Sequence, residues 1–181
     1  GATRVVFIDL DRLLHWQEAW PAELAGVLND HRGADLTVLG RTARAFATHP
    51  GIQRDTEAVV NTVFARLTGR QWDVLTGARG FSRRGAEAIV TGCPRERTVG
   101  TDAAWPLFLL RRRPDLRVDY REVEGLEFET ADRYADQVGA AGSVAAWTDG
   151  LDDDPQAWAD RLDLARHEVE AMLRVLDNRR T

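Results

Sequence analysis

This 181-residue sequence contains no lysine, one cysteine and no long apolar run. All 24 residues counted as Lys+Arg are arginines, which excludes a lysine Schiff base, a P-loop lysine and a lysine general base. Cys93 has no second cysteine for an intrachain disulfide or a cysteine-based zinc site, so we expect a small, half-buried apolar side chain. Without an apolar run of about 18 residues, a membrane-spanning helix is not expected.

Acidic residues outnumber basic ones by 29 to 24, and this net charge of −5 argues against general nucleic-acid binding. A hydrophobic fraction of 44% with six tryptophans is enough for the core of one domain. No signal peptide is visible, so we expect a soluble, cytoplasmic protein. Abundant arginine without lysine indicates a GC-rich bacterial genome. The chain starts without methionine just before a strand-like run, which predicts that upstream residues have been removed.

Short apolar segments alternate with helical patterns along the chain. Strands are predicted at Val5–Leu10, Asp35–Leu39, Trp72–Leu75 and Arg117–Val123, the last near a sheet edge. Helices are predicted from Pro21, from Asp55 or Thr56 to Gly69, over Arg83–Val90 after a Ser82 cap, over Ala103–Arg112, and from Pro155 onward. This alternation predicts an α/β fold with a mainly parallel sheet flanked by helices.

The predicted organisation has three parts. Residues 1–138 form the α/β domain, 139–154 form a flexible loop rich in Gly, Ala and Asp, and 155–181 form a long helix that packs on the same domain. A further loop is expected at His49–Arg54.

The clearest chemical motif is Asp9-Leu10-Asp11-Arg12, at the end of the first predicted strand. In an extended strand, residues two apart share a face, so both carboxylates can converge on one Mg²⁺ or Mn²⁺ that bridges to phosphate oxygens. The alternative is structural: Asp9 caps the next helix and Asp11 pairs with an arginine.

Two protein classes use such a pair of aspartates. In haloacid-dehalogenase-like phosphatases the first, here Asp9, attacks the phosphoryl group. That class needs a glycine and a threonine after the second aspartate, where this chain has Arg12, Leu13 and Leu14, and it needs a lysine that this chain lacks. Residues 149–152, Asp-Gly-Leu-Asp, could imitate its late acidic motif. In nucleotide-sugar glycosyltransferases, the aspartates hold the metal on the donor diphosphate.

Three later motifs favour the second class. They are Thr-Gly-Ala-Arg-Gly-Phe-Ser-Arg at 76–83, Gly-Thr-Asp-Ala-Ala-Trp-Pro at 100–106, and Val-Glu-Gly-Leu-Glu-Phe-Glu at 123–129. In this order after the aspartate pair, they resemble the second half of a family 2 glycosyltransferase with the GT-A fold, including the mannosyl- and glucosyl-phosphoglycerate synthase relatives. The resemblance covers about residues 1–135. The family's nucleotide-binding half lies upstream of the aspartate pair and is not in this sequence.

The resemblance implies a set of site residues. It assigns the metal to Asp9 and Asp11, and places Arg12 beside them at the donor diphosphate. It assigns the acceptor loop to Gly77, Ala78, Arg79 and Gly80, and makes Asp102 the catalytic base or an acceptor anchor. Arg79 could fork onto an acceptor phosphate or carboxylate. The alternatives are a plain helix cap for Asp102 and a surface salt bridge for Arg79.

Further polar residues could contribute to this site. His49 could ligate the metal or contact the acceptor, and Arg54, with Gln53 and Glu57, could line the cleft. His15 and His167 are weaker candidates, and Trp16 or Trp147 could stack on a sugar. A packed or hydrogen-bonded structural role is the alternative for each of them.

The sequence therefore predicts a metal-dependent glycosyltransferase that acts on a nucleotide-sugar donor and a small acceptor. Two alternatives stay open: the phosphatase with Asp9 as nucleophile, and a non-catalytic interaction module of degenerate GT-A fold. A homodimer, with an exposed strand edge covered by a second copy, is compatible with the last of these.

Overall fold

The computed structural model describes residues 3–29, 33–96, 99–129 and 133–177. Within this part, the strands β1 (Arg4–Phe7), β2 (Leu36–Arg41), β3 (Arg79–Ser82) and β4 (Val118–Val123) form one sheet in the order β1-β3-β2-β4. β3 is antiparallel to both of its neighbours, and β2 is parallel to β4. The α/β class is confirmed, but the prediction of a mainly parallel sheet is wrong, because β3 makes the sheet mixed.

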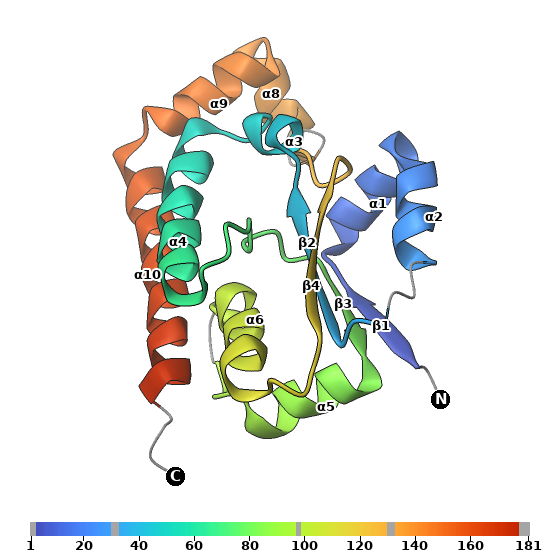
Figure 1. The fold of residues 1–181 in the computed structure, drawn as a ribbon. Helices are drawn as coiled ribbons and strands as arrows, with labels where there is room; N and C mark the ends of the chain where they lie inside the picture. The colour runs from blue at the N-terminus through green and yellow to red at the C-terminus, as the bar shows by residue number, and fades with distance from the viewer. Residues whose placement is uncertain (1–2, 30–32, 97–98, 130–132, 178–181) are drawn as a thin grey trace.

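Helices cover both faces of the sheet (Figure 1). α1 (Leu10–Ala19) and α2 (Pro21–Leu28) lie on one side. On the other side lie α4 (Gly51–Thr68), α6 (Thr101–Arg112) and α10 (Pro155–Asp177), with α10 packed against both α4 and α6. The short α3 (Ala43–Ala47) follows β2, and α5 (Arg83–Gly92) follows β3. α8 (Ala135–Ala141) and α9 (Val144–Asp152) lead into α10.

Strand β2 connects two apolar clusters. Leu36 and Val38 belong to the large core shared with α4, α6 and α10. Leu39 belongs to a smaller cluster with Trp16 of α1 and Leu24 of α2. Because successive strand residues point to opposite faces, this one strand anchors both helical layers.

Several predicted boundaries are confirmed. α2 begins at Pro21, and the Ser82 hydroxyl accepts a hydrogen bond from the Gly85 N–H at 3.1 Å, which caps α5. α4 ends at Gly69, whose φ of 74° is the left-handed conformation that glycine adopts without strain. Pro155 opens the 23-residue α10, and β4 is an edge strand.

The first and third predicted strands are corrected. β1 ends at Phe7, and as an edge strand it leaves Val5 52% exposed, so it is not a central, buried strand. Segment 72–75 is not a strand. There, the Asp73 N–H donates to the Tyr120 hydroxyl at 3.3 Å and the Val74 N–H donates to Asn61 Oδ1 at 3.0 Å. Side chains satisfy these backbone groups, so no strand partner is needed.

The two predicted loops are corrected as well. α4 begins at Gly51, inside the expected loop at 49–54. Most of segment 139–154 lies in α8 and α9, and the Ser143 hydroxyl caps α9 by accepting from the Ala146 N–H at 3.1 Å. Of the glycines here, Gly142 ends α8 at a φ of 85°, whereas Gly139 and Gly150 lie within the helices. Residues 178–181 of the predicted last part lie outside the described residues.

The structure also bears on two expectations drawn from composition, one about Cys93 and one about membrane-spanning helices. Cys93 is free and half-buried, and burial followed by the charge of Glu96 raises the pKa of its thiol to about 12. In the described part of the chain, none of the helices combines the length and the apolar character that crossing a membrane requires.

Candidate functional site

A pocket of about 290 Å³ lies where α4, the N-terminus of α6 and α10 meet segments 7–9 and 75–77. Asp9, Gly77 and Asp102 line it, so three motifs that are far apart in the sequence meet there. Arg161 and Glu168 of α10 complete its charged lining. We call this the carboxylate pocket.

Asp102 is held in place from two directions. Its Oδ2 accepts a hydrogen bond from the Gly77 N–H at 3.2 Å, and its Oδ1 lies 3.1 Å from Nη1 of Arg79. Arg79 is fully buried, and its Nη2 donates to the carbonyl oxygens of Asp102 at 2.8 Å and Val74 at 2.9 Å. Arg79 therefore lies behind the pocket and positions Asp102 through an ion pair whose arginine is fully buried, not through the surface salt bridge considered above.

Glycine is required at position 77 for two reasons. Its φ is 69°, and a Cβ there would lie 3.3 Å from Oδ2 of Asp9. A side chain would therefore be strained and would crowd Asp9. The glycine-flanked turn brings Asp9 and Asp102 to opposite sides of one loop.

Glu168 is a site residue that the sequence reasoning missed. It is 6% exposed, and its Oε2 accepts a hydrogen bond from the Ala103 N–H at 3.0 Å, at the start of α6. Burial, and then the charge of Asp102, raise the pKa of Glu168 from 4.5 to about 7. A signal was present, because Glu168 lies three residues after Ala165 and four before Met172, on the apolar stripe of the helix.

Replacing Glu168 with glutamine should stabilise the protein above neutral pH. Because the folded-state pKa is raised, the native state binds more protons than the unfolded state between about pH 4.5 and 7, and stability falls as pH rises through that window. At about 1.4 kcal/mol per pKa unit, the difference approaches about 3 kcal/mol at pH 8 and vanishes at pH 4. Urea unfolding of Glu168→Gln and wild type at both pH values measures it. Equal stabilities at pH 8 would contradict the raised pKa.

A second buried charge cluster lies beside the pocket, at the end of β2. Arg41 is 2% exposed, and it donates to Asp73 Oδ2 from Nε at 2.7 Å and to Asp73 Oδ1 from Nη2 at 2.9 Å. Its Nη2 also pairs with Glu57, which lines the carboxylate pocket. Burial alone would lower the pKa of Arg41, but the two carboxylates raise it above its ordinary value. Burial raises the pKa of Glu57. Burial also acts to raise the pKa of Asp73, but the hydrogen bonds and charge of Arg41, together with the hydrogen bond from Asn61, outweigh burial and lower it.

The two aspartates of the first motif do not occupy one strand face. β1 ends at Phe7, so Asp9 is the residue before α1 and Asp11 lies in the first turn of that helix. Asp9 lines the pocket, whereas Asp11 Oδ2 pairs with Arg133 Nη1 at 3.3 Å. Arg12 Nε lies 3.4 Å from Glu129 Oε1 and 3.8 Å from Asp9 Oδ2. The geometric premise of the metal prediction is therefore wrong. The described residues contain no group of three or more His, Cys, Asp or Glu side chains that could hold a metal.

His49 and Arg54 lie outside the carboxylate pocket. His49 is 3% exposed, its Nδ1 lies 3.1 Å from the Ala45 carbonyl oxygen, and its ring packs against Phe128. Burial, and then the charges of Arg41 and Arg12, lower the pKa of His49 to about 3, so the ring is neutral. Arg54 is half-buried on α4.

The remaining candidates are also placed elsewhere. Trp16 is fully buried and its Nε1 donates to Glu23 at 2.9 Å, so it offers no face to a sugar. His15 pairs with Glu127, and His167 with Asp163 of its own helix. Ala78 is buried in the smaller apolar cluster.

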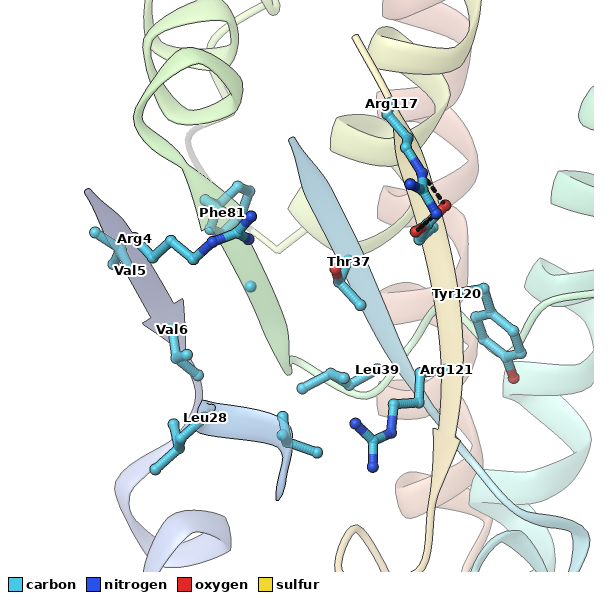
Figure 2. Close-up of a pocket in the computed structure, with 13 residues that line it drawn as sticks. Arg4, Val5, Val6, Leu28, Thr37, Leu39, Phe81, Arg117, Tyr120 and Arg121 are labelled. Carbon is cyan, nitrogen blue, oxygen red and sulfur yellow. Dashed lines mark hydrogen bonds and ion pairs between the residues drawn. The ribbon is translucent and has the colours of Figure 1, made fainter. Parts of the chain in front are cut away.

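Gly80 lies in β3 and lines a different pocket of about 290 Å³ (Figure 2). This pocket lies over the sheet face that carries Thr37 and Leu39, and Arg4, Arg117 and Arg121 extend around it. Arg4 Nη1 donates to the Ala34 carbonyl oxygen at 3.2 Å, and Arg117 pairs with Asp119. The predicted acceptor loop thus divides: Gly77 faces the carboxylate pocket, and Gly80 faces the opposite side of the sheet.

Comparison of the chain with protein-family models, with curated proteins and with solved structures found no match.

Proposed function

We propose that this chain is the acceptor-binding part of a GT-A-like glycosyltransferase that moves a sugar from a nucleotide-sugar donor to a small acceptor. One observation carries the proposal: Asp9, Gly77 and Asp102, drawn from the ordered motifs on which the family resemblance rests, line a single pocket. The proposal assigns the acceptor hydroxyl to this carboxylate pocket.

The pocket has the groups needed to take a proton from a hydroxyl. Arg79 and the Gly77 N–H fix the Asp102 carboxylate, and Asp102 in turn disfavours ionisation of Glu168. With a pKa of about 7, Glu168 can accept a proton and release it near neutral pH. In this proposal Asp102 holds the acceptor hydroxyl, and either carboxylate receives its proton as the oxygen attacks the anomeric carbon.

The divalent cation of the proposal would supply charge stabilisation to the leaving diphosphate. Among the described residues only Asp9 of the aspartate pair faces the pocket, and Asp11 is paired with Arg133. The residues present do not form a chelating set, so no step is derived through a metal, and metal dependence stays a prediction.

Thermal unfolding with nucleoside diphosphates tests the proposal. In a protein that carries its native upstream sequence, with UDP, GDP or ADP at about 100 times its Kd and with MgCl₂ or MnCl₂, we expect stabilisation of about 2.7 kcal/mol, which corresponds to a Tm rise of about 5–10 °C. Asp9→Ala with Asp11→Ala should abolish the shift, and Asp163→Asn, an exposed carboxylate on α10, should keep it. Asp102→Asn should keep the shift but lose transfer to the acceptor by a factor of about 10²–10⁴.

Two results would contradict the proposal in favour of its alternatives. Hydrolysis of an aryl phosphate that is lost in Asp9→Asn would favour the phosphatase. No shift with any nucleotide, together with a dimer by light scattering, would favour an interaction module. A specific observation supports that module: in the described part of the sheet β1 pairs only with β3, and its Val5, Val6 and Phe7 are 52%, 37% and 46% exposed.

A further inference from the structure

Another pocket, of about 470 Å³, adjoins the carboxylate pocket. Arg161 and Leu164 of α10 line both pockets. On α4, Ile52 and Gln53 line the new pocket, and Thr56 and Glu57, one turn further along, line the carboxylate pocket. The two pockets are therefore neighbours in the groove between α4 and α10. We call the pocket of about 470 Å³ the aromatic pocket.

Aromatic rings form the outer wall of the aromatic pocket. Phe128 stacks on Trp147 with ring centroids 6.1 Å apart and an interplanar angle of 23°. Tyr134 packs against Trp147 at 5.6 Å, and Trp147 Nε1 donates to Gln137 at 3.3 Å. All four residues line the pocket. Aromatic walls of this kind bind the faces and edges of rings through dispersion and the ring quadrupole.

This wall is fastened to the rest of the domain. The Asp152 carboxylate at the end of α9 accepts hydrogen bonds from the Gly51 N–H at 3.0 Å and the Ile52 N–H at 2.8 Å, at the N-terminus of α4. The Trp158 Nε1–H donates to the Asp152 carbonyl oxygen at 2.7 Å. A Cβ at Gly51 would lie only 2.5 Å from Asp152 Oδ2, so glycine allows this close approach. These contacts hold α9 against α4.

Arg161 brings a positive charge to the junction of the two pockets. Its Nη2 donates to Gln53 Oε1 at 3.0 Å, and Nη1 lies 3.8 Å from Glu57 Oε1. Glu57 is already paired with Arg41 through its other oxygen. Asp160 also lines the aromatic pocket, and its Oδ1 accepts a hydrogen bond from Gln156. Burial lowers the pKa of Arg161, because the charge of Glu57 opposes it only in part and the charges of Arg12 and Arg41 act in the same direction as burial.

We propose that the aromatic pocket binds the ring of an acceptor that carries a phosphate or carboxylate, and that Arg161 binds that anionic group. This assignment rests on the proposed function, because it places the acceptor's hydroxyl at the carboxylate pocket and its ring in the neighbouring one. A guanidinium forks onto phosphate and carboxylate oxygens, and the partly buried position of Arg161 strengthens such a contact.

Calorimetric titration with phenyl phosphate, n-octyl phosphate and inorganic phosphate, without a nucleotide, tests the assignment. We expect phenyl phosphate to bind at least about tenfold more tightly than inorganic phosphate and more tightly than octyl phosphate, because the pocket wall favours a ring. Arg161→Gln should weaken phenyl phosphate binding by about 10- to 100-fold. Trp147→Ala should weaken it by about tenfold, and Trp147→Phe should restore most of the loss.

Arg166→Gln is the matched control, since Arg166 is an exposed arginine of the same helix that pairs with Asp163 and Glu170. It should leave binding unchanged. Equal binding of phenyl phosphate and inorganic phosphate, or equal affinities in wild type and the folded Arg161→Gln and Trp147→Ala variants, would overturn the assignment. If octyl phosphate binds more tightly than phenyl phosphate, the pocket prefers an alkyl chain to a ring, and the assignment is overturned as well. Because no donor is present, failure here is separate from failure of nucleotide binding or sugar transfer.

Discussion

Arg41→Met should lower the free energy of unfolding by about 3–5 kcal/mol at pH 7. Methionine is also long and unbranched, but it removes the cation from between Asp73 and Glu57. Glu57 is buried, only 11% of the Asp73 side chain is exposed, and Arg41 makes a two-point contact with Asp73. Removing one partner of a buried ion pair leaves the remaining charges without compensation. Urea unfolding at low temperature measures the loss through the transition midpoint.

Two further variants make the Arg41 prediction specific. Arg44→Met removes an arginine whose side chain is 47% exposed and which pairs with Glu124 and Glu127, so we expect a change below about 1 kcal/mol. Adding Asp73→Asn and Glu57→Gln to Arg41→Met should recover part of the stability, because the uncompensated charges disappear. A similar cost for Arg41→Met and Arg44→Met would contradict a buried charge cluster.

Arg79→Met should cost a similar amount, about 3–5 kcal/mol, and should also disturb the carboxylate pocket. Arg79 is 0% exposed, and it binds the Val74 carbonyl, the Asp102 carbonyl and the Asp102 carboxylate. Without it, the turn that contains Gly77 and the start of α6 lose their common anchor. Chemical denaturation gives the stability change, and the rate of sugar transfer to the acceptor reports on the pocket.

The control for Arg79 is Arg83→Met, a nearby arginine whose side chain is 71% exposed, and this variant should unfold like wild type. The double variant Arg79→Met with Asp102→Asn should be more stable than Arg79→Met alone, because no partly buried carboxylate then lacks its cation. If the double variant loses the sum of the two single losses, the pair does not interact and the positioning role of Arg79 is wrong.

Local signals in the sequence predicted α2, α4, α5, α6 and α10, whereas α1, α3, α8 and α9 were not predicted. Pro21 and Pro155 open helices because a proline N–H is not needed in the first turn, Ser82 caps α5 with its hydroxyl, and Gly69 ends α4 in the left-handed conformation. These effects depend on a few neighbouring residues. Strand prediction was less successful, since apolar segment 72–75 finds its hydrogen-bond partners in Asn61 and Tyr120 rather than in another strand.

The candidate site shows the same difference between what local motifs predicted and what long-range contacts decided. Asp9, Gly77 and Asp102 were identified from motifs, and they do line one pocket. Glu168 was not identified, because a glutamate on an apolar helix stripe becomes recognisable as a site residue only once the start of α6 packs against it and donates a hydrogen bond to it. His49 and Arg79 were expected at an acceptor, but folding buried both.

The sequence by itself determined the absence of lysine chemistry and of an intrachain disulfide in these 181 residues, the α/β class, and the motifs on which the proposal of sugar transfer rests. The tertiary structure decided the antiparallel placement of β3, the separation of Asp9 from Asp11, and the gathering of Asp102, Glu168 and Arg161 around adjoining pockets. The physical reason is the separation along the chain of the residues that interact. Caps and turns follow from neighbouring residues, whereas strand order, desolvation and charge compensation depend on contacts between residues far apart in the chain.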